Sequence, residues 1–176
     1  MSAGPSAVRI RFAVVADAAA LAAFAARTFA TTFASDNTAS DMALHLAEAY
    51  GPAQQGAEIA DPRMATVVAE VDDTLVAFAQ LRAGPAPACV SGPAPIELLR
   101  FYVDHGWHGR GVAAALMAEV MATARARGTR TLWLGVWERN PRAIAFYGKV
   151  GFTDVGAHVF QLGTDAQTDR ILTTAL

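Results

Sequence analysis

The sequence has little cysteine, no excess of basic charge and no long apolar run. Cys89 is the one cysteine among 176 residues, which excludes an intramolecular disulfide and makes a reducing cytoplasm the expected location. The net charge is -2 at neutral pH, so no broad basic surface is expected for the phosphates of DNA or RNA. A signal-peptide pattern and an apolar run of bilayer-spanning length are also lacking, so neither nucleic acid nor membrane is expected as a partner.

Potential metal ligands are equally sparse. The four histidines (His45, His105, His108 and His158) and Cys89 are scattered, without the short spacings of a zinc site. No metal is therefore expected.

Apolar residues are abundant. Hydrophobic residues make up 53% of the chain and charged residues 17%, which is enough apolar surface to offset the entropy lost on folding. Because domains usually hold roughly 100–200 residues, we expect one domain over residues 1–176.

Hydrophobic periodicity predicts strands and helices that mix along the chain, with turn residues between them. Strands are expected at residues 8–14, 64–70, 74–82, 96–103, 131–137, 152–155 and 158–162, and helices at 17–33, 41–50, 54–59, 112–127 and 141–150. Asp72-Asp73 predicts a hairpin turn, Asp17 the N-cap of the first helix, and residues 84–95 a proline-rich loop. Residues 168–174 are expected to form a closing tail.

The first functional motif is His108-Gly109-Arg110-Gly111-Val112-Ala113, between a predicted strand and a predicted helix. Glycines there let backbone amides approach a diphosphate, and the helix N-terminus adds unpaired N–H groups and a favourable dipole. A P-loop is excluded, because Val112-Ala113 stand where it needs lysine and then serine or threonine.

A dinucleotide-binding fingerprint is the alternative for the same glycines. Gly109, Gly111 and Ala114 satisfy its spacing, and Glu138 ends the next strand where a ribose-binding acid belongs. Against it, residues 104–108 separate strand and first glycine, and too few residues follow for the usual six-stranded sheet. A small nucleotide-dependent oxidoreductase therefore stays open as an alternative.

The second motif, Asn140-Pro141-Arg142-Ala143-Ile144-Ala145-Phe146-Tyr147-Gly148-Lys149-Val150-Gly151-Phe152, joins a turn asparagine, a helix with an aromatic pair and a Gly-Phe exit into a strand. With both motifs in this order, the chain resembles the GNAT superfamily of N-acetyltransferases. The resemblance implies an α/β (α+β) fold with a mostly antiparallel sheet of about six or seven strands, flanked by helices and splayed between the fourth and fifth strands. It also implies transfer of acetyl from acetyl-CoA, as cosubstrate, to a primary amine of a small molecule.

The resemblance implies roles for particular positions. Cofactor-binding residues would be Phe101, Tyr102 and Val103 on the splayed strand, His108, Gly109, Arg110, Gly111, Val112, Ala113 and Ala114 at the diphosphate turn, and Asn140, Ala143, Phe146 and Lys149. Tyr147 would protonate the departing thiolate as general acid. Strand parity puts Glu97 on the face of Phe101 and Val103, which makes it the candidate base or the residue that positions a basic water. His108 departs from the family, which usually has glutamine or arginine there.

A closer resemblance involves residues 28–37 and 160–169, which look similar to the PaiA type of polyamine acetyltransferase. It implies a polyamine or diamine substrate and is compatible with a homodimer. Acidic residues such as Asp36, Asp41 and Glu48 would attract a cationic amine, although solvated carboxylates on helices are the commoner arrangement. A non-catalytic acyl-CoA sensor is the second alternative, because it would share the cofactor motifs.

Overall fold

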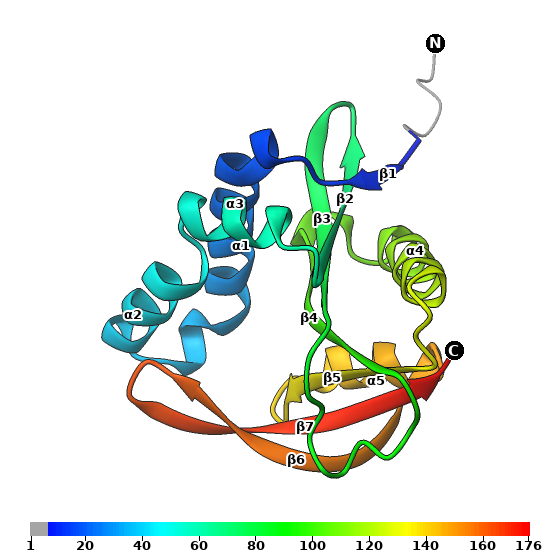
Figure 1. Cartoon of the computed structure of the whole chain (residues 1–176). Coiled ribbons are helices and arrows are strands. Elements are labelled where there is room, and N and C mark those ends of the chain that lie inside the picture. The colour runs from blue at the N-terminus through cyan, green and yellow to red at the C-terminus, as the bar shows by residue number, and fades with distance from the viewer. Residues whose placement is uncertain (1–6) are drawn as a thin grey trace.

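The computed structural model describes residues 7–176 as a seven-stranded sheet with helices on both faces (Figure 1). The strands are β1 (Arg9–Phe12), β2 (Met64–Val71), β3 (Thr74–Arg82), β4 (Pro95–Val103), β5 (Thr131–Trp137), β6 (Thr153–Leu162) and β7 (Asp165–Ala175). The helices are α1 (Ala18–Phe33), α2 (Ala39–Ala49), α3 (Pro52–Ala60), α4 (Val112–Ala126) and α5 (Pro141–Lys149), with short 3-10 turns at Val15–Asp17, Ala34–Asp36 and His105–Trp107.

The strand order is β1-β2-β3-β4-β5-β7-β6, and β4–β5 is the one parallel pair in this sheet. That parallel pairing covers only Pro95–Glu97 against Thr131–Trp133, beyond which the two strands diverge. The sheet is therefore mostly antiparallel and splayed between its fourth and fifth strands, as the resemblance implied. An all-parallel dinucleotide-binding sheet is excluded, and the oxidoreductase alternative loses its structural basis.

Two hydrophobic cores hold the layers together. Leu116, Met117 and Val120 of α4 pack with α5 against one face of the sheet. Leu21 and Phe24 of α1 pack with α2 against Phe78 on the opposite face. Figure 1 shows the consequence, with α1, α2 and α3 on one side of β2–β4 and α4 on the other.

Predictions that depended on local signals are confirmed. Asp72 and Asp73 both have positive φ (49° and 57°), as a tight hairpin turn requires, and they join β2 to β3. Gly128 and Gly151 end α4 and α5 with φ of 79° and 98°, in the conformation that favours glycine.

The C-terminal prediction is wrong. Residues 153–162 form one strand, β6, which bends at a bulge between Asp154 and Gly156 instead of breaking into two. The predicted tail is part of β7, an 11-residue strand that lies between β5 and β6. A long β6–β7 hairpin therefore forms one whole end of the sheet.

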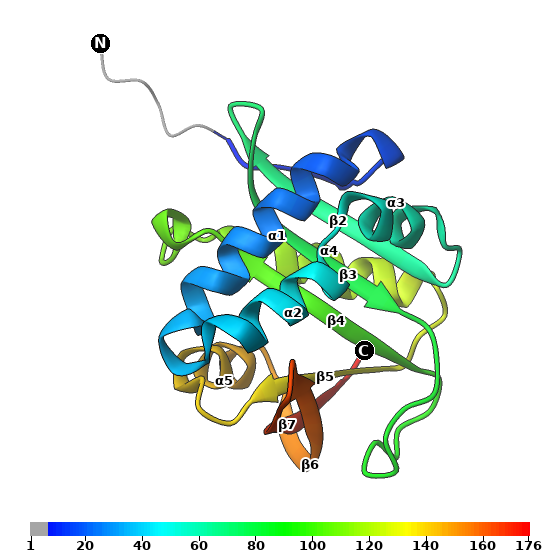
Figure 2. The same ribbon diagram turned by 90° about the vertical axis from the view of Figure 1, so that its left-hand side faces the viewer.

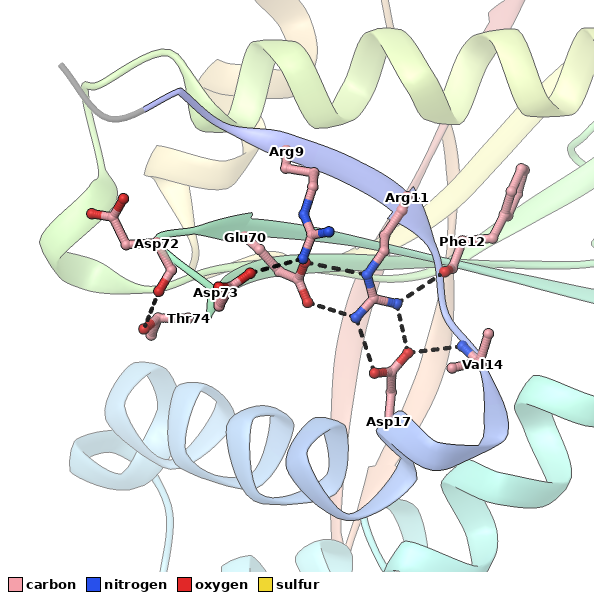
Figure 3. Close-up of polar contacts among 9 residues, drawn as sticks. All are labelled: Arg9, Arg11, Phe12, Val14, Asp17, Glu70, Asp72, Asp73 and Thr74. Atoms are coloured by element: carbon pink, nitrogen blue, oxygen red, sulfur yellow. Dashed lines mark hydrogen bonds and ion pairs between the residues drawn. The ribbon is translucent and has the colours of Figure 1, made fainter. Parts of the chain in front are cut away.

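Asp17 is the N-cap residue of α1 as predicted, but its carboxylate makes no capping bond to the helix. It accepts hydrogen bonds from Arg11 (2.7 and 3.0 Å) and from the amide of Val14 (2.8 Å). Arg11 also pairs with Glu70 of β2 at 2.6 Å (Figure 3). This network ties the short edge strand β1 to β2 and to the start of α1.

Within residues 7–176, no helix is long and apolar enough to cross a membrane. The same residues contain no group of three or more His, Cys, Asp or Glu side chains that could hold a metal ion.

Candidate active site

The divergence of β4 from β5 opens a cleft of about 800 Å³. Its walls come from α1, β4, the turn after β4, β5, the N-terminal part of α5 and the β6–β7 hairpin. Figure 2 shows β4 and β5 separating, with α1 and α2 in front of β4 and the β6–β7 hairpin below β5. The cleft thus connects the α4–α5 side of the sheet with the α1 side.

The glycine turn lies at the α4 mouth of this cleft. Gly109 and Gly111 have φ of 74° and 82°, and a Cβ on either would meet nothing within 4 Å, so backbone conformation is the reason for glycine there. In the described chain, the first α4 amide with an acceptor is that of Ala115, which donates to the Gly111 carbonyl (3.0 Å). The preceding amides are left for an anion.

Side chains at the turn have different surroundings. Val112 is fully buried in the core, so only its backbone is available to a ligand. The guanidinium of Arg110 lies 5.3 Å from the Trp107 ring centre, at an exposed position. His108 is exposed, and its Nε2 lies 2.9 Å from the carbonyl oxygen of Val103, so this ring braces the turn against the end of β4.

Residues 101–103 line the cleft as predicted, but Glu97 does not. A bulge in β4 pairs Leu81 with Leu98 and Gln80 with Arg100, so Leu99 is extra and the side-chain alternation shifts by one. Glu97 consequently shares a face with Tyr102, and the parity prediction is wrong. Its carboxylate pairs with Arg82 at 2.7 Å, outside the residues that line the cleft.

The start of α5 forms the wall facing β4. Asn140 accepts the amide of Ala143 (3.2 Å) through Oδ1, which caps the helix, and both residues line the cleft. Phe146 stacks on Phe101 with 5.6 Å between ring centres. Lys149 is exposed on the last turn of α5 and is not among the cleft-lining residues.

Tyr147 lies on this wall with only 8% of its surface exposed, and it lines the cleft. Its ring contacts Phe101 and Phe152, while no described residue makes a hydrogen bond to its hydroxyl. Burial raises the pKa of Tyr147, because ionisation would place a phenolate in an apolar setting. The phenol is therefore held protonated and free to donate.

Sequence reasoning assigned no individual site role to much of the remaining cleft lining. This part includes Arg27, Thr28, Thr31, Thr32 and Phe33 of α1, Gly135 and Trp137 of β5, Arg142 of α5, and Phe160, Gln167 and Asp169 of the β6–β7 hairpin. The threonines at helical spacing were a visible signal in α1. For Asp169 the one signal was its place in residues 160–169, whose resemblance to the PaiA type gave no role to single residues, and its segment was expected to be a tail.

Comparison with known proteins agrees with this geometry. The model of the acetyltransferase (GNAT) family matches residues 19–152. The chain is 36% identical to an uncharacterised N-acetyltransferase of Mycobacterium bovis over 160 residues, covering 91% of this chain and 98% of the relative. It is 35% identical to an uncharacterised N-acetyltransferase of Lactobacillus delbrueckii subsp. lactis, covering 88% and 89% of the two chains.

Among solved structures, the fold is similar to that of the PaiA N-acetyltransferase from Thermoplasma acidophilum, which was crystallised in complex with coenzyme A. The TM-score is 0.81 at 21% identity, over 97% of this chain and 99% of the other. At that identity the likeness shows the fold alone.

Proposed function

Since the chain belongs to the acetyltransferase (GNAT) family, we propose that it transfers the acetyl group of acetyl-CoA to a primary amine of a small molecule. The observation that carries this proposal is that one cleft joins a helix N-terminus with free amides to a phenol that has no hydrogen-bond partner in the described chain. Acetyl-CoA carries a thioester at the end of its pantetheine arm and a diphosphate beyond that arm, so its two groups match the two parts of this cleft.

The cofactor would enter from the α4 mouth. The amides of Gly109 and residues 111–114 would hold the diphosphate, with the Arg110 guanidinium adding charge. The exposed edge of β4 at Phe101–Val103 would pair with the amides of the pantetheine arm, as an added strand does. Asn140 would offer its Nδ2 to the same arm, because its Oδ1 already caps α5.

The reaction then needs a neutral amine and a proton for the sulfur. The nitrogen attacks the thioester carbonyl, the C–N bond forms, and the C–S bond breaks. An ammonium substrate loses two protons: the first before it attacks, and the second when the attacking nitrogen becomes an amide. Tyr147 would give its own proton to the departing thiolate and recover the second proton from the nitrogen. The first proton therefore needs a different acceptor.

For the acceptor, we propose a polyamine or diamine. The chain shares its fold with the PaiA protein of Thermoplasma acidophilum, and carboxylates line the acceptor side of its cleft. A second cationic nitrogen would strengthen binding to such carboxylates.

Two measurements test this function. Acetyl-CoA at 100 times its dissociation constant should stabilise the folded protein by roughly 2.7 kcal/mol in a thermal-shift assay, and NAD should not. Thiol release measured over amines that include spermidine, putrescine and an amino acid should then give turnover with the first two. Stabilisation by acetyl-CoA without turnover of any amine would instead support the acyl-CoA sensor.

A further inference from the structure

Two carboxylates line the cleft, and they differ in how they are paired. Asp104 is engaged, because it pairs with Arg27 at 3.2 Å and accepts the amide of Gly106 at 3.0 Å. Asp169 is only 9% exposed, and its nearest ionic partner in the described chain is His158 Nε2, 3.8 Å from Oδ2. That separation is longer than a hydrogen bond, and the histidine is cationic only when protonated.

A strand glycine leaves room for the side chains of this pair. Asp169 and His158 face each other across β7 and β6, and Gly135 of β5 lies next to both. A Cβ at Gly135 would come within 3.1 Å of Asp169 Oδ2 and 3.1 Å of His158 Nε2. Glycine weakens a strand, and the φ of Gly135 is not in the left-handed region, so the close approach of the Asp169 and His158 side chains explains this glycine better than backbone geometry.

Asp169 lies in the same cleft as Tyr147, whereas His158 is behind it and not among the cleft-lining residues. Asp169 is opposite Trp137 where β5 has separated from β4, and both residues line the cleft. Tyr102 of β4 also lines the cleft, with its hydroxyl 3.1 Å from that of Tyr50; burial raises the pKa of Tyr102, and the Asp169 carboxylate raises it further. Tyr102 in turn lies close enough to add to the raised pKa of Tyr147, whose main cause is burial.

Resting on the acetyltransferase function proposed above, we propose that Asp169 binds the acceptor amine and that the Asp169–His158 pair takes its first proton. The ammonium would sit over Gly135, with one N–H donated to the Asp169 carboxylate. Since this carboxylate has no arginine or lysine partner among the described residues, a cationic amine supplies the charge that it lacks.

The protons balance in this scheme. The ammonium gives one proton to the pair, and the neutral nitrogen attacks the thioester carbonyl. The C–S bond breaks, the sulfur takes the Tyr147 proton, and the nitrogen returns its second proton to Tyr147. His158 passes the first proton to water, for which its 37% exposed side chain provides a route.

The charges around Asp169 are consistent with this role. His158 faces it from β6 and Tyr102 from β4, while α1 offers threonines and an Arg27 that is already paired with Asp104. Burial raises the pKa of Asp169 and the adjacent histidine lowers it, with burial the larger cause. A carboxylate of raised pKa is a better proton acceptor than a solvated one.

The test is Asp169→Asn, with kcat/KM measured for spermidine, or for whichever amine is turned over fastest, across pH 6 to 9. We expect kcat/KM to fall at least ~100-fold, the acidic limb of the pH profile to flatten, and acetyl-CoA affinity to stay within about threefold. Gly135→Ala, whose Cβ would come within 3.1 Å of both side chains and displace them, should raise the KM for the amine and leave acetyl-CoA affinity unchanged.

Asp154→Asn is the matched control, because Asp154 is an exposed carboxylate of the same hairpin that pairs with Arg170 at 2.8 Å. It should retain wild-type kinetics. If wild-type protein turns over amines and Asp169→Asn keeps kcat/KM within threefold with an unchanged pH profile, this inference is wrong and the acetyltransferase function stands. If wild-type protein turns over no amine, both are overturned.

Discussion

Tyr147→Phe removes a single oxygen atom from the cleft, and its effects on rate and on stability should diverge. The hydroxyl makes no hydrogen bond within the described chain and belongs to a side chain that lines the cleft, so its removal breaks no hydrogen bond. Because no hydrogen bond is lost, the free energy of unfolding should stay within about 1 kcal/mol of the wild-type value. A general acid contributes roughly 10²- to 10⁴-fold, so the reaction barrier should rise by about 3–5 kcal/mol.

The assay is thiol release at saturating acetyl-CoA, together with calorimetric titration of coenzyme A and thermal unfolding. Tyr50→Phe is the matched control, because the Tyr50 hydroxyl lies 3.1 Å from that of Tyr102 and outside the cleft lining. That variant should lose about 1 kcal/mol of stability and keep its turnover within about threefold. If Tyr147→Phe retains more than a tenth of the wild-type kcat, another group protonates the sulfur and the reasoning fails.

The pH dependence of kcat provides a second test of the role of Tyr147. Because burial raises the pKa of Tyr147, the acid stays protonated beyond the ordinary tyrosine pKa of about 10. The kcat of the wild-type protein should therefore show no decline from phenol ionisation up to that pH. A basic limb with a midpoint near 9 that disappears in Tyr147→Phe would contradict the environment described for this side chain.

Three further substitutions test other parts of the account. Glu97→Gln should leave kcat within about threefold, since its carboxylate pairs with an arginine outside the cleft; a ~100-fold loss would restore it as the base. His108→Ala should weaken coenzyme A binding less than ~10-fold in calorimetry, because backbone amides supply most of the contacts; a larger loss would assign the imidazole a direct role. Glu70→Gln should destabilise the protein by about 1–2 kcal/mol at neutral pH in urea unfolding, by weakening its bonds to Arg11. Arg11 lowers the pKa of Glu70, so the difference in unfolding free energy between wild type and Glu70→Gln is fully present above the ordinary glutamate pKa. It should vanish as the pH falls below the lowered pKa. A difference that persists at that low pH would contradict the ion-pair explanation.

The cofactor side of the cleft could be predicted because its signals are local. The glycine turn, the Asn-Pro start of α5 and the Asp72-Asp73 hairpin each constrain a few consecutive residues, and the structure places all three as expected. Whether Tyr147 and the cofactor residues play their predicted roles stays a prediction for the variants above.

The acceptor side could not be predicted, because it depends on pairing between distant strands. The alternation in β4 shifts at Leu99, and that shift exists only through the register with β3, so parity counted along the sequence misplaced Glu97. Asp169 enters the cleft because β7 inserts between β5 and β6. Its neighbours in the sequence give no sign of that arrangement.

The central claim is that the amides around Gly111 bind a diphosphate. Calorimetric titration with coenzyme A and with pantetheine, which lacks the diphosphate and nucleotide, tests it most directly. We predict that pantetheine binds at least ~100-fold more weakly, because charge-assisted hydrogen bonds contribute about 1.5–3 kcal/mol each. Equal dissociation constants for the two ligands would contradict the account.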